Sequence, residues 1–128
     1  MVAKADARRL LLVDDEVGYL DVLAKRLTHR DFEVTTASSG TEAIRALRKW
    51  EFNLAVVDLK MEDMDGIEVL KVLKKMDPAL QVIILTGHGS ERAARDGIAH
   101  GAFDYLIKPI GLDPLIARIE AALSSDPA

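Results

Sequence analysis

The sequence predicts an α/β fold in which five parallel strands alternate with five helices. Short apolar segments alternate along the chain with longer segments whose apolar residues recur at helical spacing, and this pattern is typical of a parallel sheet. The alternation fills the sequence of 128 residues without a linker or a low-complexity tract. We therefore expect one domain over residues 1–128, with a folded core at about 8–123.

The apolar segments give the positions and the order of the strands. The strands are expected at 8–13, 33–37, 53–58, 81–86 and 103–107. The first, third and fourth are continuously apolar, as expected of strands covered by helices on both faces, whereas the second and fifth include polar residues, as edge strands can. With right-handed crossovers, these properties predict the strand order 2-1-3-4-5 of a doubly wound, flavodoxin-like sheet.

The first two helices are expected at about 16–30 and from Ser39 onward. Ser39 and Glu42 have the spacing of a capping box, in which the serine hydroxyl accepts an amide hydrogen bond and the glutamate reaches back to the cap. Apolar residues at helical spacing give each helix a side that faces the sheet. The core-facing candidates are Val17, Leu20, Leu23 or Ala24, Leu27, Ile44, Leu47 and Trp50.

The third and fifth helices have start signals. Asp65 can cap the third helix, and Asp77-Pro78 ends it. Asp113 followed by Pro114 gives a cap with proline at the first helical position of the fifth helix. The core-facing candidates of these two helices are Ile67, Leu70, Leu73, Met76, Leu115, Ile119 and Leu123.

The fourth helix, which opens at Ser90, is the weakest of the five. Its core-facing candidates are Ala93, Ala94 and Ile98, and Gly97 costs roughly 1 kcal/mol relative to alanine in a helix interior. Small residues allow close packing against the sheet. Alternatively, low local stability suits an element that shifts when the protein changes state, and we favour this second interpretation.

Composition argues against several classes of function. The formal net charge of −4 argues against a nucleic-acid surface, because phosphate binding needs a positive patch. The absence of cysteine excludes disulfides and thiolate metal sites. The apolar run that follows the basic N-terminus is too short for a signal peptide or a membrane span. We therefore expect a cytoplasmic protein that contacts neither nucleic acid nor membrane directly.

Polar side chains end or directly follow four of the predicted strands. They are Asp14, Asp15, Asp58, Thr86 and Lys108. In a sheet with the predicted order, the ends that carry these side chains meet at one edge, where such folds bind ligands. Two carboxylates ~4 Å apart repel each other by roughly 4 kcal/mol at an effective dielectric constant of about 20. The group therefore needs a cation, and oxygen ligands of this kind suit Mg²⁺.

The same set of residues can hold a phosphoryl group around one carboxylate. Lys108 supplies an ammonium and Thr86 a hydroxyl, and phosphoryl transfer depends mainly on positioning and charge neutralisation. Asp58, alone at the end of the central strand, is expected to be the nucleophile that forms an acyl phosphate. An acidic pair such as Asp14-Asp15 is more often a solvated turn, and only its combination with the other three residues favours a functional site.

Four segments together resemble a known family. They are LLVDDE at 11–16, VVDLKMEDMDG at 56–66, ILTGHG at 84–89 and GAFDYLIKPI at 101–110. In this order and at this spacing, the chain resembles the receiver domain of two-component response regulators, of the kind found in chemotaxis regulators. The last segment looks most like receivers attached to sigma-54-dependent activators, or like stand-alone regulators.

The resemblance implies a magnesium-dependent phosphoacceptor. Asp58 would accept phosphate from a sensor histidine kinase or a phosphotransfer protein, and Lys108 would pair with the phosphate. Asp15 and Asp58 would bind Mg²⁺ directly together with the backbone carbonyl of Lys60, while Asp14 would act mainly through water. The domain would assist its own phosphorylation and dephosphorylation without being an enzyme.

The resemblance also implies a conformational switch. The Thr86 hydroxyl would swing to a phosphoryl oxygen, and the Tyr105 ring would turn inward behind it. This change would reshape the face formed by the fourth helix, the fifth strand and the fifth helix, which an effector domain, an effector protein or a second copy in a phosphorylation-dependent homodimer would read. The Lys108–Pro109 peptide bond is expected to be cis.

Several residues depart from the family pattern. Glu62 stands where many members have proline, which loosens this loop, and Gly87 stands where alanine is more usual. Lys60 and His88 flank the site at positions that influence the attacking water in relatives. We hypothesise that these two side chains set the lifetime of the phosphate.

Other polar residues have simpler interpretations. Glu16 is expected to be a first-turn residue favoured by the helix dipole rather than a metal ligand. Tyr105 on its own would be a half-buried aromatic of an edge strand. No ligand spacing links His29, His88 and His100.

Three other functions are less consistent with the sequence. A magnesium-dependent phosphatase with an aspartate nucleophile would need a second aspartate where Lys60 stands. A nucleotide or flavin binder would need a glycine-rich phosphate loop where the acidic DDEVG stands. A pseudo-receiver used only for binding would not need the complete acidic set. We expect either a stand-alone regulator or a piece of a longer protein.

Overall fold

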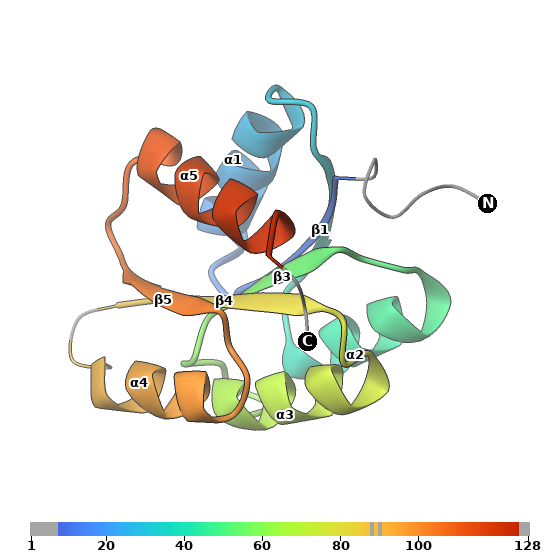
Figure 1. Cartoon of the computed structure of the whole chain (residues 1–128), viewed down its shortest axis with the longest axis vertical. Coiled ribbons are helices and arrows are strands. Elements are labelled where there is room, and N and C mark those ends of the chain that lie inside the picture. The colour runs from blue at the N-terminus through green and yellow to red at the C-terminus, as the bar shows by residue number, and fades with distance from the viewer. Residues whose placement is uncertain (1–7, 88, 90, 126–128) are drawn as a thin grey trace.

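Ten elements alternate along the chain in the computed structural model, which describes residues 8–87, 89 and 91–125 (Figure 1). The strands are β1 (Arg9–Val13), β2 (Glu33–Ala37), β3 (Leu54–Val57), β4 (Gln81–Thr86) and β5 (Asp104–Ile107). The helices are α1 (Val17–Thr28), α2 (Gly40–Lys49), α3 (Gly66–Met76), α4 (Glu91–Ala99) and α5 (Leu112–Leu123). The predicted α/β alternation is confirmed, with small differences in the bounds of the elements.

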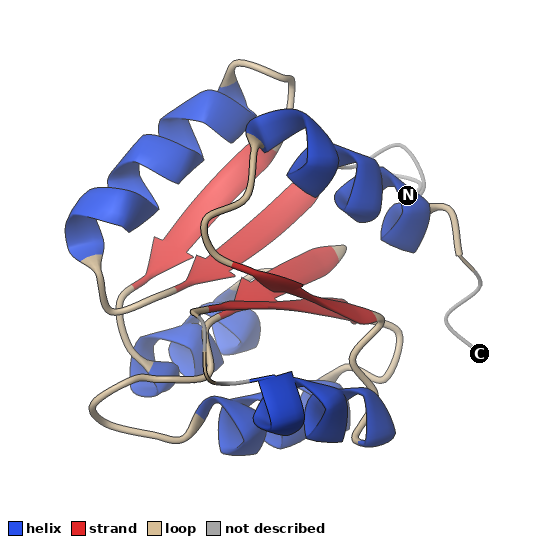
Figure 2. Cartoon of the chain, turned by 90° about the vertical axis from the view of Figure 1, so that its left-hand side faces the viewer, coloured by secondary structure: helices blue, strands red, loops and turns tan. Residues whose placement is uncertain are grey.

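All strand pairings are parallel, and the order β2-β1-β3-β4-β5 matches the prediction. Helices α1 and α5 cover one face of the sheet, and α2, α3 and α4 cover the other (Figures 1 and 2). Alternate residues of each central strand therefore enter opposite cores: Leu10 and Leu12 pack toward α1 and α5, whereas Leu11 and Val13 pack toward the three-helix side. The sheet is covered on both faces, as the apolar central strands predicted.

Residues near helix ends are more exposed than the helical pattern predicted. Val17 is 54% exposed, Trp50 53%, Met76 39% and Ile98 41%. Val17 and Met76 are the terminal residues of α1 and α3, and Trp50 caps the end of α2. The predicted core-facing positions are wrong there, because the apolar stripe of a helix extends past the edge of the sheet that it covers.

Helix α4 packs closely on the sheet through small residues. Ala94 and Gly97 are buried, whereas Ala93 is exposed, so this predicted core position is wrong. A Cβ at Gly97 would lie 2.2 Å from Cδ1 of Ile84 on β4. This contact supports close packing as one reason for the small residues of α4. The predicted start at Ser90 lies outside the described residues.

The helix caps differ in part from the predicted ones. The Ser39 hydroxyl accepts a hydrogen bond from the Glu42 amide, as predicted, but the Glu42 carboxylate accepts from the amide of Ser38 rather than from that of the cap. Asp65 caps α3 by accepting from the Ile67 amide at 2.9 Å. The prediction for α5 is wrong: this helix starts earlier, with Gly111 as its cap residue. Its proline is tolerated because the first-turn amides have no partner within the helix.

Gly66 at the start of α3 contacts the backbone that follows β3. Its amide donates to the Leu59 carbonyl at 3.0 Å. An added Cβ would lie 2.4 Å from the Leu59 Cα and 2.5 Å from the Asp58 carbonyl oxygen. Both atoms belong to the backbone, so relief would require the loop or the helix to move. The absence of a side chain at Gly66 therefore fixes how closely α3 approaches the end of β3.

We predict that Gly66→Ala lowers the free energy of unfolding by about 1–3 kcal/mol, because overpacking against backbone cannot be relieved by a rotamer change. Gly18→Ala in α1 is the control, because no atom lies within 4 Å of its added Cβ. The control should leave stability unchanged or raise it by up to about 1 kcal/mol. Urea unfolding followed by circular dichroism measures both, and equal stability of the two variants would contradict the prediction.

Candidate functional site

Asp14 and Asp58 lie side by side at the carboxyl edge of the sheet. Val13 pairs with Val57 in the β1–β3 register, and the two aspartates are the next residues on their strands. The Asp58 amide donates to the Val13 carbonyl at 2.9 Å, which extends the ladder to the site. Asp14 is 5% exposed and Asp58 6% exposed. The parallel register therefore brings two buried carboxyl groups together.

Thr86 provides a hydroxyl to Asp58. This residue is fully buried at the end of β4, and its Oγ1 donates to Asp58 Oδ1 at 2.8 Å. The backbone amide of Lys60 lies 3.4 Å from the same oxygen. One oxygen of Asp58 is thus directed toward donors from β4 and from its own loop.

Lys108 contacts three carboxylates from the other side. Its Nζ donates to Asp14 Oδ2 at 2.6 Å and to Glu16 Oε1 at 3.2 Å, and lies 3.7 Å from Asp58 Oδ2. The ring of Tyr19 on α1 lies 4.5 Å from the same nitrogen, a cation–π contact. The predicted cis bond between Lys108 and Pro109 is confirmed.

Burial and the neighbouring charges shift the pKa values of Asp14 and Lys108 in opposite directions. Burial raises the pKa of Asp14 above its ordinary value and outweighs the hydrogen bonds from Lys108 and from the Glu16 amide. Burial lowers the pKa of Lys108, but the adjacent carboxylates of Asp14, Asp58 and Glu16 outweigh it, so that this pKa is raised. The site therefore favours a protonated Lys108 and disfavours the negative charge of Asp14.

Oxygen atoms of Asp14, Glu16 and Asp58 lie within 4.8 Å of one another and could together hold a metal ion. Such an oxygen-only set fits Mg²⁺ rather than a softer metal. The predicted first-turn position of Glu16 is wrong by one residue: Glu16 is the N-cap residue of α1, makes no side-chain capping bond, and contacts Lys108. Glu16 is the third consecutive acid after β1, and this run of acids could have indicated that it belongs to the site. We instead explained Glu16 by the helix dipole.

Asp15 and Tyr105, two further predicted site residues, are half-buried. Asp15 is not part of the group of three acids, and its role as a metal ligand stays a prediction. Tyr105 pairs with Ile84 in the β4–β5 register, two residues before the level of Thr86, so that Tyr105 and Thr86 point to the same face of the sheet. Their role as a switch pair stays a prediction, and His88 lies outside the described residues.

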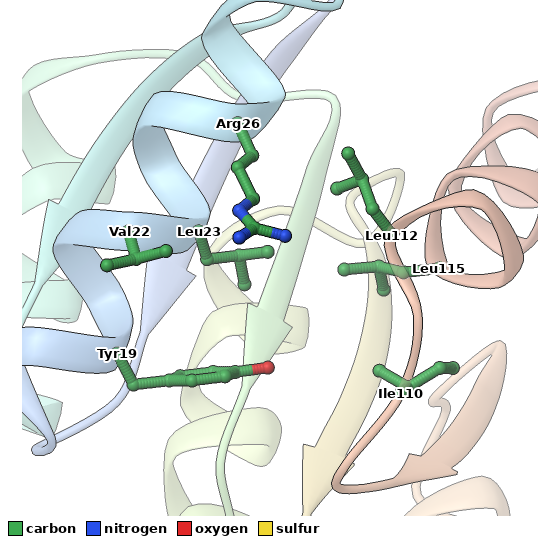
Figure 3. A pocket seen from close by; sticks show the side chains of 7 residues that line it. All are labelled: Tyr19, Val22, Leu23, Arg26, Ile110, Leu112 and Leu115. Carbon is green, nitrogen blue, oxygen red and sulfur yellow. The ribbon is translucent and has the colours of Figure 1, made fainter.

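A groove of about 230 Å³ lies beside the site, between α1 and the segment that leads into α5 (Figure 3). The residues that line it are Tyr19, Val22, Leu23, Arg26, Ile110, Leu112 and Leu115. Tyr19 belongs both to this groove and to the contacts of Lys108. The acidic cluster and the groove therefore share one side chain.

Comparison with known proteins identifies the family. Residues 10–120 match the family model "Response regulator receiver domain". The chain belongs to this family. It is 42% identical over 114 residues, 89% of its length, to the transcriptional regulatory protein GlrR of Escherichia coli (strain K12). That alignment covers 26% of the relative, so the chain spans about a quarter of the length of the curated relatives it matches.

Solved receiver structures have the same fold. A response regulator receiver domain protein from Clostridium thermocellum superposes with a TM-score of 0.86 at 36% identity, covering 90% of this chain and 93% of that one. The receiver domain of NtrX from Brucella abortus gives a TM-score of 0.87 at 34% identity, covering 91% and 99%. This receiver is therefore a phosphoacceptor signalling domain of a two-component system.

None of its described helices is long and apolar enough to cross a membrane.

We predict that Asp14→Asn reduces the pH dependence of stability in metal-free buffer. Because the pKa of Asp14 is raised in the folded protein, the folded state retains a proton that the unfolded chain releases at about pH 4. In the wild type, the free energy of unfolding contributed by this group falls as pH rises from there through the folded pKa. Urea unfolding at several pH values should show a smaller fall for the variant. Parallel profiles would contradict the prediction.

Proposed function

We propose that this receiver is phosphorylated at Asp58 in a magnesium-dependent transfer from a histidine kinase, and that the phosphate then changes the face formed by α4, β5 and α5. One observation carries the proposal. The buried Asp58 carboxylate lies between the hydroxyl of Thr86 at 2.8 Å and the ammonium of Lys108 at 3.7 Å. A nucleophile with a hydroxyl and a cation on either side is the arrangement that phosphoryl transfer needs.

The acids of the site fit the metal that the family implies. We propose that Asp15, Asp58 and the backbone carbonyl of Lys60 hold Mg²⁺ directly and that Asp14 holds it through water. Glu16 adds a further carboxylate beside them. When bound, Mg²⁺ would neutralise charge on the phosphoryl oxygens and on the acids around them.

The transfer step uses residues of this chain in separate roles. An oxygen of Asp58 attacks the phosphorus atom while the bond from phosphorus to the donor nitrogen breaks, and the electron pair of that bond remains on the histidine. Lys108 moves from Asp14 to pair with a phosphoryl oxygen. The products are an acyl phosphate on Asp58 and a free histidine on the donor, whose nitrogen takes up a proton from water.

The switch step follows from the same contacts. Thr86 donates to Asp58 before transfer, and we propose that its hydroxyl moves to a phosphoryl oxygen afterwards. The space that it leaves on this face of the sheet would admit the Tyr105 ring from the neighbouring strand. The population would shift toward this arrangement to the extent that the phosphorylated state favours it.

The remaining parts of the proposal concern the context of the domain. We propose a single receiver domain with its core at about residues 8–123, working in the cytoplasm. Its partners would be a sensor kinase or phosphotransfer protein upstream and an effector downstream, with a homodimer as one form of output. The domain would promote its own phosphorylation and dephosphorylation but would not act as a separate enzyme.

We predict that the wild type gains the mass of one phosphoryl group when incubated with acetyl phosphate and Mg²⁺, because Asp58 is positioned as a nucleophile. Asp58→Asn should remain unmodified, and omission of Mg²⁺ should slow the wild-type reaction strongly. Intact-protein mass spectrometry measures all three samples. A wild type that stays unmodified, with this donor and with every kinase offered, would contradict the proposed function.

We also predict that Mg²⁺ raises the stability of the folded protein. A ligand that binds only the folded state at about a hundred times its Kd adds roughly 2.7 kcal/mol to the free energy of unfolding. Urea unfolding with Mg²⁺ or with a chelator measures this difference. Asp58→Asn should show a much smaller difference, and an equal one would place the metal elsewhere.

A further inference from the structure

Asp63 connects the loop that follows β3 to the start of α2. Its Oδ1 accepts from the Gly40 amide at 2.9 Å, and its Oδ2 accepts from the amide and the hydroxyl of Thr41 at 3.0 and 2.9 Å. Gly40 and Thr41 are the first two residues of α2. Asp63 therefore caps, from a distant part of the chain, two amides that the helix itself cannot satisfy.

The start of α2 also packs closely against the loop and α3. A Cβ at Gly40 would lie 2.8 Å from Cγ2 of Val69 and 2.9 Å from Sδ of Met64. Met64 belongs to the loop and Val69 to α3, and α2 and α3 lie side by side (Figure 1). The start of α2 therefore contacts the loop through side chains as well as through hydrogen bonds.

The charge of Asp63 suits this position. The hydrogen bond from the Gly40 amide, followed by those from Thr41, lowers the pKa of Asp63 below its ordinary value. A carboxylate at a helix start is also favoured by the helix dipole. The contact is therefore made by the ionised carboxylate at neutral pH.

The loop that Asp63 fixes also carries the residues of the site. It runs from Asp58 to Asp65, between β3 and α3, and no proline restricts its backbone. Lys60, whose amide lies 3.4 Å from Asp58 Oδ1, is three residues before Asp63. At the other end, Asp65 and Gly66 fix the loop to α3.

We infer that Asp63 is a positioning residue: by fixing this loop to α2 it holds the backbone at Lys60 in place for Mg²⁺ beside Asp58. The inference rests on the proposed function, because it assigns the loop to the metal site. Asp63 itself is exposed and belongs to neither the nucleophile nor the metal ligands. Its effect passes through the loop backbone, where small displacements weaken a site of fixed geometry.

The test compares two variants that remove the same charge. Asp63→Ala removes every acceptor, whereas Asp63→Asn retains one acceptor oxygen for the α2 amides. Glu62→Gln removes a charge from the neighbouring exposed position of the same loop. For each protein, the Kd for Mg²⁺ is measured by NMR titration, the exchange of the Gly40 and Thr41 amides by hydrogen exchange, and the rate of phosphorylation by acetyl phosphate at low and at saturating Mg²⁺.

We expect Asp63→Ala to weaken Mg²⁺ binding by about threefold to tenfold, because supporting groups around metal sites have effects of this size or larger. Phosphorylation should slow by a similar factor at low Mg²⁺ and recover at saturating Mg²⁺. Exchange at Gly40 and Thr41 should accelerate. The Kd of Asp63→Asn for Mg²⁺ should fall between those of the wild type and Asp63→Ala. Glu62→Gln should change the Kd less than Asp63→Ala does.

Several results would overturn the inference. One is an unchanged Kd in Asp63→Ala despite faster exchange, which would make the contact purely structural. Another is an equal weakening in all three variants, which would reduce the effect to charge. A wild type that binds Mg²⁺ but takes no phosphate would refute the proposed function alone, since the titration still decides the inference. A wild type that binds no Mg²⁺ would refute both.

Discussion

The structure depends on the crowding of buried negative charge at one edge of the sheet. The register of β1 and β3 places Asp14 beside Asp58, and Glu16 lies within reach of both. Lys108 reaches all three of these acids. One ammonium does not balance three carboxylates, and burial in addition raises the pKa of Asp14. The strand order therefore determines that these acids meet at one edge of the sheet.

Each group that contacts Asp58 comes from a segment that leads into a different part of the surface. Thr86 ends β4 just before the connection to α4, and Lys108 follows β5 just before the connection to α5. The loop after Asp58 leads into α3 and is fixed to α2 through Asp63. Under the proposed function, a chemical change at Asp58 would act on these helices through contacts that already exist, without a long chain of intermediates.

Sequence patterns were sufficient for the strand order and for the convergence of Asp14, Asp58, Thr86 and Lys108, because both follow from which strands are apolar and how parallel strands connect. Exposure at helix ends was not predictable, since periodicity does not show where the sheet stops. The contact of Asp63 with Thr41 joins residues 22 apart, and no local spacing indicates it. The contact of Glu16 with Lys108 joins residues 92 apart, so the local sequence indicated only the position of Glu16 at the start of a helix.

The close seat of α4 has a mechanical consequence. At the point where this helix meets β4, Gly97 offers only backbone to Ile84, and Ala94 offers only a methyl group. A helix that presents no long side chain to the sheet has few interlocking contacts to lose when it slides or rotates. We therefore expect α4 to slide or rotate on β4 easily. A small shift at the end of that strand would displace the helix without repacking the core.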